Sequence, residues 1–284
     1  MMRFERGGTA TALRERSDRR PVIPGASAGR RGRQSTIKIE RLSVVVPVYN
    51  EADNIPALVQ EIEQAAPRLA DDYEIIIVDD GSTDATPERL AELARTCRQL
   101  RIARLAQNRG QSAALAHGIE LAGFDWVGTL DGDGQNIPAD FAHLIRAVEQ
   151  HERPAQVGLV MGHRQQRNDP WIKRISSKIA NATRMRLLGD GVPDTGCGIK
   201  LIRRELFMVL PRFNHMHRFL PVLCQMHDFE VLSVPVGHRP RQSGRSKYGT
   251  LDRLAAGLLD LFGVWWLKRR HIPIRKPGKE TDRQ

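Results

Sequence analysis

The sequence predicts an α/β fold, with a mostly parallel sheet and flanking helices. Strand-like apolar runs alternate with segments of helical period between residues 42 and 130, an order typical of parallel sheets joined by right-handed crossovers. The runs are continuous rather than alternating, which indicates strands buried on both faces. Polar clusters follow the strands, where sheets of this kind bind their ligands. A chain of 284 residues with 40% hydrophobic content can form such a core.

Each element of this pattern has its own signal. Strands are expected at residues 42–48, 74–78, 100–105 and 126–130. Helices are expected at about 53–66, 85–98 and 110–122. The first helix keeps a helical period, with Asp53 or Asn54 as cap, at Ile55, Leu58, Val59 and Ile62. A helix face at Phe141, Leu144, Ile145 and Val148 and a strand at 158–162 continue the alternation.

Polar residues follow all four early strands. They are Asn50-Glu51, Asp79-Asp80, Asn108-Arg109, and the pair Asp131 and Asp133. The carboxyl ends of parallel strands meet at one edge of the sheet, so these clusters favour a functional site over four unrelated polar turns. None of the turns carries a G-x-G-x-x-G or G-x-x-x-x-G-K-[ST] pattern, which disfavours a dinucleotide or P-loop site.

Asp131 and Asp133, with one glycine between them, form a candidate metal site. In an extended backbone, residues i and i+2 point to the same side and lie roughly 6–7 Å apart. Two ionised carboxylates at that distance repel each other unless a cation lies between them. Oxygen ligands suit Mg²⁺ or Mn²⁺, and Gln135 can add a neutral oxygen. The alternative is a polar turn after a buried strand.

Four motifs, at residues 46–51, 78–84, 110–122 and 131–135, together resemble family 2 glycosyltransferases. The resemblance covers about residues 41–250 and is strongest to the dolichyl-phosphate and polyprenyl-phosphate sugar synthases. It implies a GT-A fold, a GDP- or UDP-sugar donor and an inverting transfer. Gly132 and Gly134 depart from the Ala and Leu that are frequent in the polyprenyl-phosphate branch.

The resemblance also implies roles for single residues. The nucleotide base and ribose would be lined by Pro47, Tyr49 and Glu51, with Asp79 nearby, and the metal and diphosphate would be held by Asp131, Asp133 and Gln135. Arg164 is expected to bind the donor diphosphate or the acceptor phosphate. Arg241 and Lys247 are expected in a mobile loop that closes over phosphates. The expected catalytic residues are therefore Asp131, Asp133, Arg241 and Lys247.

The acceptor decides whether the enzyme needs a base. A polyprenyl phosphate is already anionic near neutral pH, so a metal ion and Arg/Lys clamps are sufficient to hold the two anions together. A hydroxyl acceptor would need a proton acceptor, and Asp194 is the matching residue. A third alternative is a membrane-bound scaffold that binds nucleotide-sugars without turnover, although its aspartate pair would be expected to be broken.

The net charge of +11 lies in the two ends of the chain. Residues 1–40 carry nine Arg and one Lys against four acidic residues, and residues 268–284 carry seven basic against two acidic residues. The neutral body and the lack of an aromatic-basic platform disfavour a nucleic-acid partner. Basic ends favour an anionic membrane surface, and solvated tails are the alternative.

The sequence therefore divides into a disordered basic tail at 1–40, a glycosyltransferase domain at 41–248, and a membrane-associating helix with a basic tail at 249–284. The helix is expected at about 249–267, with an apolar face at Leu251, Leu254, Ala255, Leu258, Phe262 and Trp265. Trp265-Trp266 before Lys268-Arg269-Arg270 is typical of a helix that lies in the membrane interface rather than spanning it. A core helix is the alternative. We expect a peripheral protein at the cytoplasmic membrane face.

Cysteine and histidine add no metal or disulfide signal. Cys97, Cys197 and Cys224 lack C-x-x-C spacing and indicate reduced thiols in a cytosolic compartment. No apolar run of signal-peptide length begins the chain, so secretion is not expected. His215 and His217 lack a carboxylate partner in the sequence and are not expected to bind metal.

Overall fold

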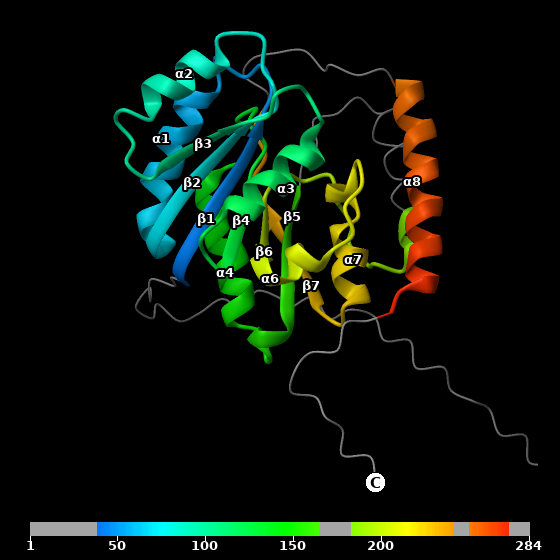
Figure 1. The fold of residues 1–284 in the computed structure, drawn as a ribbon. Helices are drawn as coiled ribbons and strands as arrows, with labels where there is room; N and C mark the ends of the chain where they lie inside the picture. Colours follow the sequence, from blue (N-terminus) through cyan, green and yellow to red (C-terminus); the bar gives the residue numbers. More distant parts are fainter. Residues whose placement is uncertain (1–38, 165–182, 241–249, 273–284) are drawn as a thin grey trace, which may run out of the picture. The chain divides into compact units, whose positions relative to one another are not determined.

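A seven-stranded sheet forms the centre of the protein (Figure 1). The computed structural model describes residues 39–164, 183–240 and 250–272, all within one compact unit. The strands are β1 (Ile39–Val48), β2 (Ala70–Asp79), β3 (Leu100–Arg104), β4 (Trp126–Thr129), β5 (Val157–Arg164), β6 (Lys200–Arg203) and β7 (Glu230–Val236). Their order across the sheet is β3-β2-β1-β4-β6-β5-β7. The predicted α/β fold is confirmed.

The sheet is mostly parallel, as predicted. β1 pairs in parallel with β2 and β4, β2 with β3, and β5 with β7, whereas β6 is antiparallel to both of its neighbours. All strands of this sheet except β6 therefore point their carboxyl ends to one edge. The reversed strand β6 begins at that edge, at Lys200. The sequence pattern did not predict this reversal.

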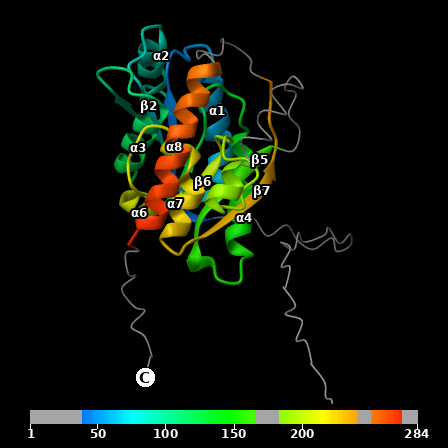
Figure 2. The same cartoon turned by 90° about the vertical axis from the view of Figure 1, so that its right-hand side faces the viewer.

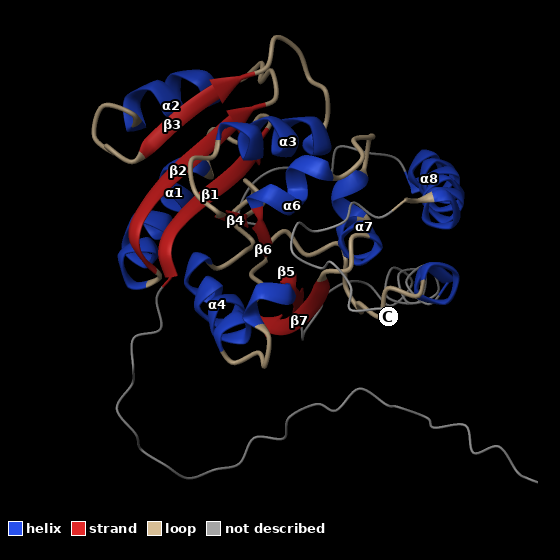
Figure 3. Ribbon diagram, turned by 60° about the horizontal axis from the view of Figure 1, so that its bottom comes forward, coloured by secondary structure: helices blue, strands red, loops and turns tan. Residues whose placement is uncertain are grey.

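Helices cover both faces of the sheet (Figure 3). Helices α1 (Ile55–Ala65), α2 (Thr86–Leu93) and α4 (Phe141–Glu149) pack on one face; α3 (Gln111–Leu121), α6 (Arg204–Val209), α7 (Leu220–Met226) and α8 (Thr250–Arg270) pack on the other. Strand β1 serves both layers because Val44 and Val46 face the first cluster and Val45 faces the second. α8 lies beside α7 (Figure 2).

The bounds of three elements differ from the sequence prediction. Strands β1 and β2 begin several residues earlier than expected, at Ile39 and Ala70. Helix α2 ends at Leu93 rather than near residue 98. The carbonyl of Leu93 accepts from the amides of Thr96 and Cys97 and also from the Thr96 hydroxyl, so the chain makes one last turn after the helix. Cys97 then packs into the core instead of continuing the helix.

The three cysteines are buried and free, so no disulfide contributes to the fold. Burial raises the pKa of the Cys97 thiol to about 11, and the neighbouring Glu63 adds to this rise. Burial alone raises the pKa of the Cys224 thiol even further. All three side chains therefore serve as small apolar groups in the core.

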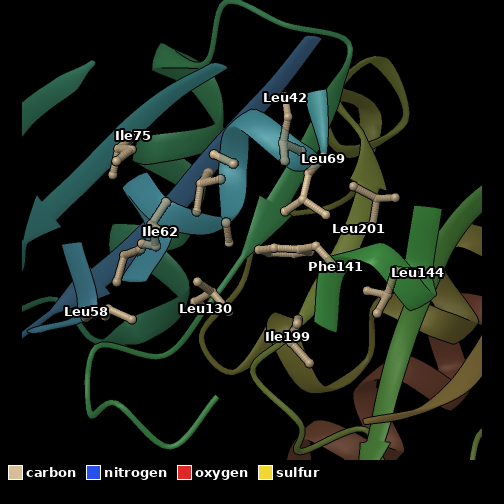
Figure 4. Close-up of a cluster of buried hydrophobic side chains, with 14 of the residues drawn as sticks. Leu42, Leu58, Ile62, Leu69, Ile75, Leu130, Phe141, Leu144, Ile199 and Leu201 are labelled. Atoms are coloured by element: carbon tan, nitrogen blue, oxygen red, sulfur yellow. The ribbon is translucent and has the colours of Figure 1, made fainter. Parts of the chain in front are cut away.

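Phe141 occupies the middle of the cluster between the sheet and helices α1 and α4 (Figure 4). Its side chain is only 1% exposed and is among the largest fully buried ones. Leu130 and Leu144 are also buried in this cluster. Removal of the ring would therefore leave a cavity directly behind the strand that leads to Asp131.

We expect Phe141→Ala to lower the free energy of unfolding by about 3–5 kcal/mol, because it loses buried area and leaves a cavity. Val209→Ala is the control, since Val209 is 46% exposed at the end of α6; it should cost about 0.5–1 kcal/mol at most. Denaturant unfolding measures both values. Equal costs for the two variants would show that Phe141 is not a central core residue.

Candidate functional site

The ends of β1 and β2 are fastened to each other by Asn50. Asn50 has a left-handed backbone, with φ of 53°, and its side-chain oxygen accepts a hydrogen bond from the amide of Thr83 at 2.8 Å. Its own amide donates to the hydroxyl of Ser82 at 2.9 Å. The carboxylate of the adjacent Glu51 accepts from the Asn54 side chain at 2.6 Å. These contacts fix the first two polar clusters as one rigid surface.

Asp79 and Asp80 point to different partners. Asp79 Oδ1 accepts from the amide of Ser82 at 2.8 Å. Its buried Oδ2 lies 3.2 Å from Nε of Arg104 but has no hydrogen-bonded partner among the described residues. Asp80 accepts from the amides of Arg109 and Gly110 at 2.7 and 2.8 Å, and so it holds the entry to α3.

The predicted nucleotide residues lie next to one another in the sheet. Pro47 and Val48 of β1 pair with Val78 and Asp79 of β2, so Asp79 lies beside the end of β1. Pro47 is buried and Tyr49 is half-buried. Oδ2 of Asp79 is buried at this position beside the guanidinium of Arg104.

Asp131 and Asp133 lie in a turn that is hydrogen-bonded from three directions. Asp131 Oδ1 accepts from the side chain of Gln111, the first residue of α3, at 2.7 Å. The Asp131 amide donates to Asn136 Oδ1 at 3.1 Å, and Asp133 Oδ1 accepts from the Gln135 amide at 3.2 Å. Sequence reasoning missed Gln111, because nothing in the chain near it pointed to Asp131.

The Asp131 carboxylate rests directly on the backbone of the loop before β6. A Cβ at Gly198 would lie 2.3 Å from Asp131 Oδ2, so no side chain fits there. A Cβ at Gly132 would lie 2.7 Å from Val48 Cγ1, which gives a steric reason for glycine at the position where the resemblance suggests alanine. Thr129 Oγ1 donates to the Gly198 carbonyl at 2.8 Å and fixes this loop on β4.

The electrostatics of this turn suit a divalent cation. Burial raises the pKa of the Asp131 carboxyl and the charge of Asp133 adds to the rise, whereas the ammonium of Lys200 opposes it. Lys200 is itself buried, with its ammonium donating to the carbonyl of Cys197. In the part of the chain that the structure describes, no cluster of three His, Cys, Asp or Glu residues could hold a metal ion alone. Two carboxylates fit Mg²⁺ or Mn²⁺, which take further oxygens from bound phosphates.

Gln135 also anchors the segment after β7. Its side-chain amide donates to the Arg239 carbonyl at 3.2 Å, and the Arg239 amide donates to the Gln135 carbonyl at 3.0 Å. The Arg239 guanidinium binds Glu61 at 2.7 Å. Arg239, two residues before Arg241, is therefore held beside the acidic turn. Arg241 and Lys247 themselves lie outside the described residues.

Arg164 and Asp194 form a bidentate ion pair at the same edge. Arg164 Nε and Nη2 donate to the two carboxylate oxygens of Asp194 at 2.8 and 3.0 Å. Burial lowers the pKa of the Arg164 guanidinium, but the hydrogen bonds and charge of Asp194 raise it above its usual value. The Gly196 amide also donates to Asp194, at 3.2 Å. Arg164 and Asp194, which the sequence analysis considered separately, thus bind each other.

Comparison with known proteins gives a family match. Residues 43–210 match the sequence model described as glycosyl transferase family 2. The dodecaprenyl-phosphate galacturonate synthase of Rhizobium johnstonii is 34% identical over 243 residues, which are 84% of this chain and 70% of that protein. The undecaprenyl-phosphate 4-deoxy-4-formamido-L-arabinose transferase of Pseudomonas fluorescens is 36% identical over 224 residues, or 78% and 64% of the two chains. The chain spans about two thirds of the length of these relatives.

Solved structures share the fold. A glucosyl-3-phosphoglycerate synthase from Mycobacterium tuberculosis, in complex with Mn²⁺, UDP and glucosyl-3-phosphoglycerate, is 22% identical with a TM-score of 0.60. The match covers 83% of this chain and 81% of that one. At this identity, the likeness concerns the arrangement of strands and helices.

We expect Arg164→Ala to lower the free energy of unfolding by about 3–5 kcal/mol, because it leaves the carboxylate of Asp194 buried without its partner. The side chains of this pair are 18% and 9% exposed. Arg153→Ala is the matched control, because the Arg153–Glu230 pair is 63% and 33% exposed and should contribute about 0–1 kcal/mol. Denaturant unfolding distinguishes the two. A small loss of unfolding free energy for both variants would mean that the Arg164–Asp194 pair is solvated and does not stabilise the fold.

Proposed function

Because the chain belongs to glycosyl transferase family 2 and has its GT-A fold, we propose that it transfers a sugar from a GDP- or UDP-sugar to a polyprenyl phosphate. The observation that carries the proposal is the acidic turn with Asp131 and Asp133, fixed at the edge where the parallel strands end. The named relatives act on dodecaprenyl and undecaprenyl phosphates. Their names support a lipid phosphate as acceptor here.

The donor nucleotide would lie over the ends of β1 and β2. Asp79, beside the end of β1, would lie near the base. Pro47 and Tyr49 would line the base and ribose, and Glu51 would reach the ribose from the turn that Asn54 braces. The solved structure from Mycobacterium tuberculosis contains UDP and Mn²⁺, so a fold of this type accommodates both.

Asp131 and Asp133 would hold a divalent cation, with Gln135 as a neutral neighbour. When bound, such an ion offsets the charge of the donor diphosphate as it leaves. The residues of the chain do the positioning: Gln111 and the backbone at Gly198 keep the Asp131 carboxylate in one place. The buried Lys200 lies near it: its ammonium form lowers the pKa of the Asp131 carboxyl, although burial lowers the pKa of Lys200 itself. Preorganised charge of this kind is the main source of stabilisation for a departing anion.

The contacts of Asp194 favour a phosphate over a hydroxyl acceptor. Both of its oxygens already accept hydrogen bonds from Arg164, so it is poorly placed to take a proton from a hydroxyl group. A phosphate acceptor needs no such base. Its charge would be balanced by the cation and by Arg241 and Lys247, whose roles follow from the family resemblance. The intact aspartate pair argues against a scaffold without turnover.

Helix α8 offers a surface for the membrane. Its buried side consists of Leu261 and Val264, which pack into the same core cluster as α7. On other sides, Leu259, Phe262 and Trp266 are 76%, 63% and 53% exposed. Their spacing of three and four residues places them along one face of the helix. Of the apolar face that the sequence predicted, Phe262 is exposed and Trp265 is half-buried, whereas the side chains of Leu251, Leu254, Ala255 and Leu258 lie outside the described residues.

The end of α8 adds positive charge to this surface. Lys268, Arg269 and Arg270 are exposed in its last turn. Exposed apolar groups beside basic ones are typical of helices that bind anionic lipid surfaces. Where the structure describes the chain, no helix has the length and hydropathy to cross a bilayer. We propose that α8 lies on the cytoplasmic membrane face and brings the site to its lipid acceptor.

The proposal is tested by incubating the full chain with a panel of nucleotide-sugars, polyprenyl phosphate vesicles and Mg²⁺ or Mn²⁺. A lipid-phosphate-linked sugar that forms with one donor and disappears with a metal chelator is the expected product. Formation of a sugar linked to a hydroxyl acceptor instead would refute the phosphate assignment. Binding of a nucleotide-sugar with no product from any acceptor would favour the scaffold.

We expect Asp133→Ala to lower product formation by about 100-fold or more, because the cation loses one of its two carboxylates. The thermal unfolding midpoint of the metal-free protein should stay unchanged. Asp125→Ala is the control: Asp125 is an exposed aspartate at the opposite end of the same strand. Full activity of the Asp133 variant would overturn the metal assignment.

A variant with Leu259→Ser, Phe262→Ser and Trp266→Ser should bind anionic vesicles at least about tenfold more weakly, because it loses the apolar contact. Ile102→Ser, at an exposed position on the edge strand β3, is the control. Salt should release the wild-type protein only in part, because screening weakens the basic contacts but not the apolar ones. Vesicle sedimentation measures both effects. Undiminished binding of the triple variant would place the membrane contact elsewhere on the chain.

A further inference from the structure

The turn at His215, Met216 and His217 connects two parts of the protein that the proposed function treats separately. His215 has a left-handed backbone with φ of 63°, and a single 3₁₀ turn, Met216–Arg218, follows it. This geometry sends the two imidazoles in different directions: His215 contacts α8 and His217 contacts α3. The two rings therefore contact different elements, and His215 has a carboxylate partner, Asp260, that its neighbours in the sequence do not supply.

We call His217 the inner arm of this turn and His215 the outer arm. The inner arm reaches the amino end of α3. His217 is 8% exposed, and its Nδ1 lies 2.7 Å from the hydroxyl of Ser112. The His217 amide also donates to this hydroxyl, at 3.4 Å. Burial lowers the pKa of the His217 imidazole well below its usual value, and the nearby Lys200 adds to this effect. The ring is therefore neutral, and one hydrogen bond joins its Nδ1 to the Ser112 hydroxyl, with the donor set by the tautomer of the ring.

Ser112 stands next to the residue that contacts the acidic turn. Gln111 precedes it in α3 and donates to Asp131 Oδ1 at 2.7 Å. Asp80 fixes the chain just before the helix, through the amide of Gly110. The amino end of α3 is thus held on one side by Asp80 and on the other by His217. Both contacts act within two residues of Gln111.

The outer arm reaches helix α8. His215 Nδ1 lies 2.9 Å from Asp260 Oδ2, and both side chains are partly exposed. Met216, between the two histidines, is buried in the cluster that contains Leu261 and Val264. The turn is therefore bonded to α8 by His215 and shares a buried apolar cluster with it.

We infer that this turn positions Asp131 by fixing the amino end of α3, and that it links the proposed membrane helix to the acidic turn. The positioning residues are Ser112, His215, His217 and Asp260. The Ser112–His217 hydrogen bond supports this assignment because a polar pair buried among apolar side chains is kept for its direction rather than for packing. A displacement of Gln111 would release one oxygen of the Asp131 carboxylate. This inference rests on the proposed function only where turnover is measured.

The inner arm is tested with His217→Leu, which removes the hydrogen bond to Ser112, and His217→Asn, whose side-chain amide can donate or accept near the position of Nδ1. Turnover of His217→Leu should fall about 10- to 100-fold with little change in the donor KM, because the carboxylate is misplaced rather than removed. His217→Asn should recover most of the turnover. His117→Leu is the control. His117 lies in α3, its side chain is 39% exposed, and the variant should behave like the wild type. Equal damage by the Leu and Asn variants would make His217 a packing residue and overturn the inference.

A readout without acceptor separates this inference from the proposed function. Mn²⁺ with UDP should raise the thermal unfolding midpoint of the wild-type protein, and His217→Leu should show a smaller rise at the same Mn²⁺ concentration. An undiminished rise in the variant would refute the positioning role. A wild-type protein that shows the rise but makes no lipid-linked sugar would refute the proposed acceptor only, and the comparison of variants would still hold.

The outer arm is tested by a double-mutant cycle with Asp260→Ala and His217→Leu. If α8 is linked to Asp131 through the turn, the losses in turnover should be non-additive, because both variants release the same element. Additive losses would confine the positioning role to Ser112 and His217. The same cycle with Asp260→Ala and Arg153→Ala is the control, because Arg153 lies on a different part of the surface and should give additive values.

Discussion

The closeness of Asp131 and Asp133 is the constraint on which the proposed active edge depends, that is, the edge of the sheet where the parallel strands end. Two carboxylates beside a buried sheet repel each other, and burial makes the charge on Asp131 costly. Three neighbours surround the Asp131 carboxylate. The side-chain amide of Gln111 donates a hydrogen bond to it, the backbone of Gly198 lies against it, and the nearby Lys200 ammonium lowers its pKa. In the proposed function, the charge of this pair attracts a divalent cation together with the phosphates that the cation binds.

The single reversed strand, β6, supplies much of this support. Its neighbours β4 and β5 send their carboxyl ends to the active edge, whereas β6 starts there. Lys200 and the loop with Asp194 and Gly198 therefore reach the edge from the opposite strand direction. A purely parallel sheet would offer only strand ends at this place. The reversal adds a strand beginning, with its own backbone groups and a buried cation.

The sequence predicted the parts whose signals are local. Continuous apolar runs identified the strands, and the polar residues after them predicted a site at the edge where the parallel strands end, because strand direction alone brings these ends together. The partners of Asp131 could not be predicted in this way: Gln111 lies 20 positions away in the chain, and only the packing of α3 brings it near. Arg164 and Asp194 were each predicted separately as site residues, but their 30-residue separation hid the ion pair between them.

Helix α8 has one apolar side fixed in the domain and another exposed. Its 21 residues make a rod about 32 Å long, and Val264 and the contact of Lys268 with the Leu188 carbonyl hold it along its second half. If the exposed side rests on a lipid surface, the domain cannot roll on that surface as it could on a flexible tether. The proposed site would then have one distance from the lipid headgroups and one orientation towards them. A lipid phosphate would have to cover that distance to reach the site, and the distance would limit which lipids can react.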